Sequence, residues 1–221
     1  MSVIENESDL ALSQQIANSM KEEILSGKYP PGVRIRQEDI AEQFGASRSP
    51  VREALRILEA EGLINLVAHT GAWISHLSLV ECEEMYQLRE RIEPLLLRLS
   101  IAHISESAIK ELQSLSEKME ATKDVETFLK LDREFHLLSY SGAETVLVGD
   151  MVNRLWNTTQ HYRRAYSQMM AASSFKPAHY EHHLLLTAIK KGDAEDAERI
   201  LFGHIRRTRL ELAQHPDVFN S

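Results

Sequence analysis

The stretch EDIAEQFGASRSPVREALRILEAEG, residues 38–62, decides the fold of the first third of the chain. Apolar residues at helical spacing, followed by Gly45, predict a short helix that ends in a left-handed turn. Ser49 is a favoured N-cap and Pro50 a favoured first helical residue, so a second helix is predicted from Pro50 to about Glu61. Two short helices around a tight turn are typical of a helix-turn-helix.

The second helix has two different faces. Within this helix and just before it, Arg48, Arg52 and Arg56 recur every four residues and form a basic stripe. The opposite side is apolar and consists of Val51, Leu55 and Leu58. Guanidinium groups suit DNA phosphates and guanine edges in the major groove, so the stripe indicates DNA binding. An ordinary amphipathic helix with a solvated basic face is the alternative.

The segment LINLVAHTGAWIS, residues 63–75, favours the DNA-binding interpretation. It is rich in strand-forming residues on both sides of His69, Thr70 and Gly71, a pattern that predicts a short hairpin. A hairpin that directly follows a helix-turn-helix forms a wing.

These segments resemble the N-terminal domain of the GntR superfamily of bacterial transcriptional regulators. The resemblance covers about residues 9–76, and its motifs are PPGVRI at 30–35, SRSPVREAL at 47–55, EGLI at 61–64 and Gly71. It implies a winged helix-turn-helix that binds an inverted-repeat operator in double-stranded DNA as a homodimer.

The resemblance also implies which residues contact DNA. Some family members have a basic residue in the first helix of the motif where this chain has Glu38, and Arg36 is close enough in sequence to substitute. The start of the recognition helix, its basic face and the wing tip supply the others. The expected DNA-contacting residues are Arg36, Ser47, Arg48, Ser49, Arg52, Arg56, His69 and Thr70.

Length and composition set the outer limits. The 221 residues, 43% of them hydrophobic, suffice for two small domains, expected at 1–77 and 78–221. No apolar run is long enough to span a membrane, and the N-terminus resembles no secretory signal, so a cytoplasmic protein is expected. The single cysteine, Cys82, excludes an intrachain disulfide.

The net charge of −8 is unusual for a DNA-binding protein. Residues 1–77 contain seven Lys and Arg against eleven Asp and Glu, and the remainder contains 18 against 22. Neither part is basic overall, so DNA binding must depend on where the arginines lie.

The remainder of the chain predicts an all-α bundle of six to seven helices, which makes the whole protein mainly α. Ser78 and Glu81 form a capping-box signature, and Ser105 and Asp124 are typical N-caps. The helices are expected near residues 78–103, 106–122, 125–140, 144–169, 178–191 and 194–213.

Four polar residues fall on the apolar stripes of these helices. Asp132 and His136 lie one turn apart on the same face, and His182 and His204 share faces with buried-type residues. Burying a carboxylate and three imidazoles without partners costs several kcal/mol, so they must satisfy one another or hold a cation. Mixed N and O ligands suit zinc, nickel, manganese or iron, and the ligand type alone does not choose among them; zinc is the expected metal. A hydrogen-bonded polar core is the competing interpretation.

The same region resembles the FCD ligand-binding domain of the FadR branch of GntR regulators. The matching motifs are DREFH at 132–136, EH at 181–182, GDA at 192–194 and HI at 204–205, within about residues 79–213. In metal-binding members an Asp and three His hold a divalent cation. The resemblance therefore implies the ligands Asp132, His136, His182 and His204.

Arg89 is the candidate for binding an effector. A small organic acid that fills open metal positions needs a cation, and the resemblance indicates the Arg89 guanidinium. A surface salt bridge with Glu93, four residues on, is the alternative. Thr145 replaces the Asn of many family members, so the effector is expected to differ from the family's common ones.

The sequence therefore predicts a DNA-binding transcriptional regulator, more specifically a repressor, whose operator affinity responds to a small carboxylate. Two alternatives stay open: a metal-dependent helical enzyme, and a DNA-binding protein whose metal is purely structural. No general base is evident beside the four ligands, which disfavours the enzyme.

Overall fold

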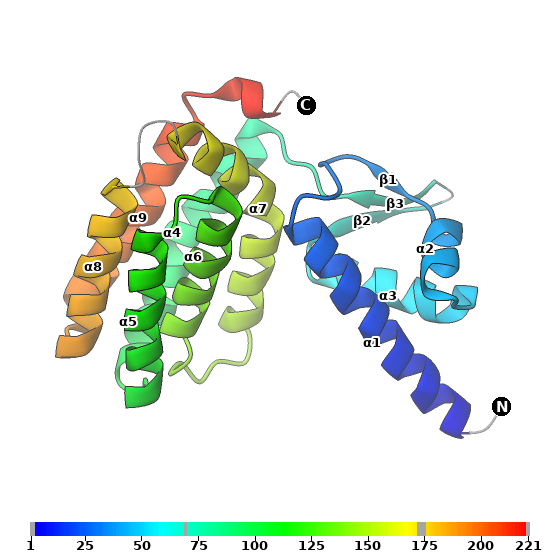
Figure 1. Cartoon of the computed structure of the whole chain (residues 1–221), viewed down its shortest axis with the longest axis horizontal. Helices are drawn as coiled ribbons and strands as arrows, with labels where there is room; N and C mark the ends of the chain where they lie inside the picture. The colour runs from blue at the N-terminus through cyan, green and yellow to red at the C-terminus, as the bar shows by residue number, and fades with distance from the viewer. Residues whose placement is uncertain (1–2, 69, 172–175, 220–221) are drawn as a thin grey trace. The chain divides into compact units, whose positions relative to one another are not determined.

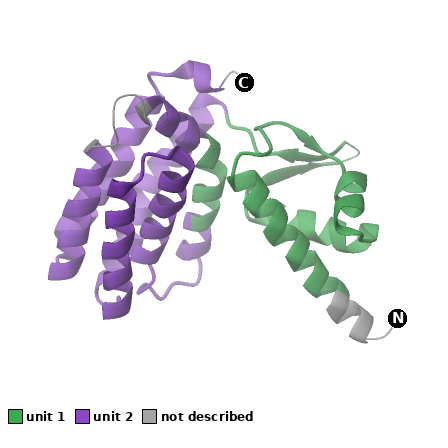
Figure 2. Ribbon diagram, in the orientation of Figure 1, with its two compact units in different colours: residues 1–77, 153–161 green, residues 78–152, 162–221 purple. Residues whose placement is uncertain are grey.

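The computed structural model of the chain describes residues 3–68, 70–171 and 176–219 (Figure 1). The backbone divides into two compact units (Figure 2). The first unit comprises residues 1–77 and 153–161, and the second comprises residues 78–152 and 162–221. The predicted architecture is confirmed, because helices and a small three-stranded sheet precede an all-helical region.

Within the described part of residues 1–77, the first unit contains the helices α1, α2 and α3 and one antiparallel sheet (Figure 1). The strands lie in the order β1-β3-β2, so the predicted hairpin of β2 and β3 gains β1 at its outer edge. Neither the first helix nor β1 was among the predicted elements. The elements are α1 Val3–Leu25, β1 Arg34–Ile35, α2 Gln37–Phe44, α3 Arg48–Ala60, β2 Ile64–Val67 and β3 Gly71–Ile74.

The turn between α2 and α3 confirms one sequence prediction and corrects another. Gly45 has φ 59° and ends α2 in the left-handed conformation, as predicted. Ser49 is not the N-cap of the next helix, because α3 begins at Arg48 and its N-cap is Ser47. Pro50 is tolerated within the first turn, where its missing N–H has no intrahelical partner. The helix can therefore begin two residues before Pro50.

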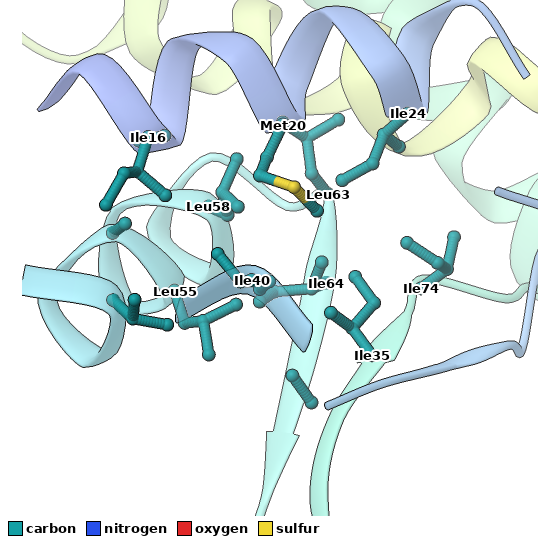
Figure 3. Packing of buried hydrophobic residues seen from close by; sticks show 14 residues of the cluster. Ile16, Met20, Ile24, Ile35, Ile40, Leu55, Leu58, Leu63, Ile64 and Ile74 are labelled. Carbon is teal, nitrogen blue, oxygen red and sulfur yellow. The ribbon is translucent and has the colours of Figure 1, made fainter. Parts of the chain in front are cut away.

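The core of the first unit fixes the orientation of α3 (Figure 3). Leu55 and Leu58 of α3 are buried against Met20 of α1, Ile40 of α2 and Ile64 of β2. Each such side chain contributes about 1.5–3 kcal/mol when fully buried. Because this face of α3 is held in the core, its basic face is directed outward.

The second unit is a bundle in which α4 packs against α9, and α5 packs against α6 and α8 (Figure 1). Ser78 begins α4 with the predicted capping box, and Ser105 and Asp124 cap the next two helices through their side chains. The elements are α4 Leu79–Ile101, α5 Glu106–Ala121, α6 Val125–Ser139, α7 Val148–Ala171, α8 Lys176–Lys191, α9 Ala194–Leu212 and the 3-10 turn Pro216–Phe219. Residues 153–161 of α7 belong to the first unit.

The predicted start of α7 near Glu144 is wrong by four residues. The helix begins at Val148, and the Thr145 hydroxyl accepts a hydrogen bond of 3.1 Å from the Gly149 N–H. A hydroxyl that satisfies a first-turn N–H is typical of a residue ahead of a helix and not of one inside it.

Gly142 fixes the end of α6 relative to α4. Its N–H donates to Ser100 Oγ at 2.9 Å, and a Cβ at this position would lie 2.3 Å from the Ser100 carbonyl oxygen. Only glycine permits this approach. On the inner face of α6, Asp132 and His136 are both buried.

Candidate DNA-binding face and candidate metal centre

The exposed face of α3 carries the predicted arginine stripe. The side chains of Arg48 and Arg56 are 80% and 63% exposed, and Arg52 is exposed as well. Arg48 lies 3.5 Å from Glu38 of α2, the acidic residue that departs from the family pattern. Exposed ion pairs of this kind contribute only about 0–1 kcal/mol, so DNA phosphates can compete for the guanidinium.

A groove of about 680 Å³ collects basic side chains from three elements of the first unit. Arg52 and Arg56 of α3, Arg36 at the start of α2 and Thr70 of the wing line it together with Arg34 of β1. Arg34 was missed by sequence reasoning. The only sequence signal was its position inside the PPGVRI motif, since β1 itself was not predicted.

The other predicted DNA contacts lie at the start of α3 and at the wing tip. Ser47 and Ser49 are exposed at the start of α3. The Thr70 hydroxyl donates to the Val67 carbonyl oxygen at 3.3 Å and accepts from Trp73 Nε1 at 3.3 Å, so it closes the wing turn. His69 lies outside the described residues.

The second unit brings the four predicted metal ligands into one cluster. Asp132 and His136 come from α6, His182 from α8 and His204 from α9. One ligand atom from each residue lies within 4.8 Å of the others. Asp132 Oδ1 lies 3.0 Å from His182 Nε2 and 3.7 Å from His136 Nε2, and these two nitrogens are 3.2 Å apart.

These distances suit a bound cation. Metal–nitrogen and metal–oxygen bonds of about 2.0–2.2 Å place neighbouring ligand atoms about 3–4 Å apart. Asp132, His136 and His182 are 4%, 1% and 1% exposed, so water does not solvate their polar atoms. One carboxylate and three imidazoles therefore form a donor set that can hold a divalent metal.

The electrostatics of the cluster favour the ligating forms. Burial alone would raise the pKa of Asp132, but the charge of Arg163 and the His182 hydrogen bond hold it well below its usual value. Burial lowers the pKa of His136 and of His204, which keeps these imidazoles neutral. An ionised carboxylate and neutral imidazoles are the forms that bind metals.

Arg163 of α7 is a second residue that sequence reasoning missed. Its guanidinium donates to Asp132 Oδ2, the carboxylate oxygen opposite the one nearest His182 and His136. Arg163 is only 8% exposed. Its separation of 31 residues from Asp132 leaves no local pattern by which sequence could have found the contact.

The other two histidines of α8 lie outside the cluster. His183 is exposed and lies 3.3 Å from Glu120 Oε2. His179 packs edge-on against Phe128, with 5.8 Å between ring centroids.

Arg89 forms the ion pair that competes with its predicted effector role. Arg89 Nε donates to Glu93 Oε1 at 2.5 Å, and Glu93 Oε2 accepts from the Tyr140 hydroxyl at 2.7 Å. The pair is buried, with side chains 3% and 0% exposed, whereas the alternative considered from sequence was a surface salt bridge. Effector binding by Arg89 stays a prediction.

A winged helix-turn-helix with an outward arginine stripe, in one chain with a helical domain, defines a DNA-binding regulator of transcription. The chain matches the FCD domain over residues 84–207 and the family "Bacterial regulatory proteins, gntR family" over residues 12–74. The protein therefore belongs to the GntR family of bacterial regulators and carries an FCD domain.

Individual relatives agree with this assignment. The chain is 29% identical over 197 residues to YdhC, an uncharacterized HTH-type transcriptional regulator of Bacillus subtilis, with 86% of each chain covered. It is 27% identical over 206 residues to RspR, an HTH-type transcriptional repressor of Escherichia coli, covering 92% of this chain and 90% of RspR. The family and these relatives are transcriptional regulators and not enzymes, as predicted.

A solved structure agrees as well. E. coli McbR/YncC superimposes with a TM-score of 0.80 at 26% identity, over 92% of this chain and 97% of that chain.

Among the described residues, no helix is both long and apolar enough to cross a membrane.

Proposed function

We propose that the protein is a metal-dependent repressor whose operator affinity is changed by a small carboxylate bound in its helical domain. Residues 1–77 read an inverted-repeat operator as part of a homodimer, and residues 78–221 bind the metal and the effector. The buried cluster of Asp132, His136, His182 and His204 carries this proposal. The assignment of RspR as a repressor supports the sign of regulation, and DNA binding supports a cytoplasmic location.

The case for the metal rests on the cost of burying these four side chains. A buried carboxylate and three imidazoles require compensation. Arg163 meets one Asp132 oxygen, and the other lies 3.0 Å from His182 Nε2 and 3.7 Å from His136 Nε2, where a cation could be held by all three side chains. Zinc matches the donor set best, with nickel, manganese or iron as alternatives. When bound, the metal would supply a Lewis-acidic position for an anionic ligand.

The case for a carboxylate effector rests on charge. Arg89 is the proposed guanidinium partner, and its two parallel donors suit a carboxylate. Its bond to Glu93 must rearrange or be shared for this contact to form. Effector binding would then favour one arrangement of the two DNA-binding units in the dimer over another, and operator affinity would change by population shift.

A thermal-shift screen tests the effector site. Small organic acids are expected to raise the unfolding temperature of the zinc-loaded protein. Ligand at 100 times its Kd stabilises by about 2.7 kcal/mol, which corresponds to about 5–10 °C for a domain of this size. A chelator should abolish the shift.

The role of Arg89 is tested in the same screen. Arg89→Lys keeps a positive charge beside Glu93 but loses the parallel donors, so a smaller shift is expected. Arg91→Lys, at an exposed position on the same helix, is the matched control and should behave as wild type. Shifts that persist in chelator would show that the acids bind away from the metal.

A further inference from the structure

The His204 ring contacts a carboxylate that is not one of the four ligands. Glu181 immediately precedes His182 on α8, and successive helical residues point about 100° apart. His182 therefore faces the cluster while Glu181 is directed toward α9, which packs against α8. Glu181 Oε2 lies 2.6 Å from His204 Nδ1.

Glu181 is itself held by a second residue of α9. Arg207 donates from Nε to Glu181 Oε1 at 2.8 Å and from Nη2 to Oε2 at 2.5 Å, a two-bond fork. Arg207 also donates from Nη1 to the Tyr166 hydroxyl at 2.7 Å. Arg207 lies three residues after His204 on α9, so one helix supplies both the imidazole and the guanidinium that orients its partner.

Arg207 makes Glu181 an acceptor. Both Glu181 oxygens receive hydrogen bonds from the Arg207 guanidinium, an arrangement that suits the ionised carboxylate. An ionised carboxylate only accepts hydrogen bonds, so His204 Nδ1 must carry the proton. The lone pair of the neutral ring then resides on Nε2.

The other ring nitrogen of His204, Nε2, is therefore available to the cluster of Asp132, His136 and His182. The His204 ring centroid lies 5.0 Å from that of His136 and 5.1 Å from that of His182. Both Glu181 oxygens are already bonded to Arg207, and one of them also meets His204. Glu181 thus stands behind the imidazole and does not belong to the ligand set.

We propose that Glu181, held by Arg207, is a positioning residue that fixes the tautomer and ring orientation of His204 so that Nε2 is presented to a divalent cation. This inference rests on the metal site of the proposed function. A carboxylate can accept a hydrogen bond from the ring nitrogen of a ligating histidine that does not bind the metal, and this raises the basicity of the ligand. Loss of such a carboxylate typically weakens metal binding about 10–100-fold.

The test is the zinc affinity of the full-length chain, measured by competition with a chromophoric chelator. Glu181→Ala is expected to raise the Kd for zinc about 10–100-fold, and Glu181→Gln, which keeps the volume but loses the charge, about 10-fold. The matched control is Glu120→Ala, because Glu120 also pairs with a histidine of α8, the exposed His183, outside the cluster. This control should keep the wild-type Kd.

A spectroscopic measurement separates positioning from mere loss of stability. Cobalt in place of zinc reports ligand geometry through its visible absorption bands, and both Glu181 variants should alter the bands while Glu120→Ala does not. Glu181→Ala leaves Arg207 partly buried without its carboxylate, so unfolding of each variant is also followed in chelator. If Glu181→Ala does not fold, the zinc affinity and cobalt bands of Glu181→Gln test the positioning role.

The outcomes for the two proposals differ. Wild-type affinity and wild-type cobalt bands in the folded Glu181 variants would overturn the positioning role while leaving the metal site intact. A wild-type chain that binds neither zinc nor cobalt would overturn the metal site itself, and the role of Glu181 with it.

Discussion

Alanine in place of Arg48 and Arg52 is expected to remove specific operator binding while leaving the protein folded. Each lost guanidinium contact with a base costs about 1–3 kcal/mol, or about 5–150-fold in affinity, and the loss is repeated in each half-site of a dimer. Both side chains are exposed, so stability should change by no more than about 0.5 kcal/mol.

The measurement is a gel-shift titration on an inverted repeat selected from random double-stranded DNA. Arg199→Ala is the control, because Arg199 is 67% exposed on α9 of the second unit and pairs with Glu195 one turn away. The salt dependence of binding should also become less steep in the two α3 variants, since fewer phosphates are neutralised. If both variants bind the operator with wild-type affinity in the gel-shift titration, α3 is not the helix that contacts the bases.

Removal of one metal ligand is the second change with a large expected effect. The purified wild-type chain should carry about one divalent metal ion, and His182→Ala should lose it. Loss of a direct ligand should weaken binding by more than about 100-fold, beyond the effect of an outer-shell partner. Elemental analysis after gentle purification measures the occupancy.

His183→Ala is the control for this variant. His183 is the next residue of α8, exposed and outside the cluster, so its loss should leave the metal content unchanged. A chelator should lower the unfolding temperature of wild type and His183→Ala but not of His182→Ala. If wild type holds no metal and added zinc, nickel or manganese restores none, the four residues are a hydrogen-bonded polar core.

The sequence predicted the elements whose signals are local. Gly45, Ser78, Ser105 and Asp124 each act within one turn of the helix end they mark, so their neighbours alone reveal them. The N-cap prediction at Ser49 was wrong because Pro50 is accepted within the first turn, so the helix begins two residues earlier and Ser47 occupies the N-cap position.

Two elements of the first unit were missed because their signals are weak. β1 consists only of Arg34 and Ile35, and it forms because β3 offers an edge to pair with. The buried residues of α1, which include Ile16, Met20 and Ile24, do recur at helical spacing, but polar residues dominate that segment.

For the site residues, too, local patterns could be predicted from sequence and long-range contacts could not. The clustering of Asp132, His136, His182 and His204 could be predicted because each residue lies on an apolar stripe and together they match family motifs. Arg163 and the Arg207 fork on Glu181 could not, because their partners are 31 and 26 residues away in sequence. Helical periodicity predicts which face of a helix is buried. Which side chains of neighbouring helices contact each other is seen only in the folded bundle.

Coupling between the helical domain and DNA is tested by an operator titration at fixed salt, with and without a small carboxylic acid found in the thermal-shift screen. We expect the acid to change the operator Kd of the zinc-loaded protein about 5–150-fold, the range of a typical coupling free energy of about 1–3 kcal/mol. Chelation, and His182→Ala, should abolish the change. If calorimetry shows that an acid binds the metal-loaded protein and the operator Kd nevertheless stays unchanged, the proposed regulation by a carboxylate is wrong.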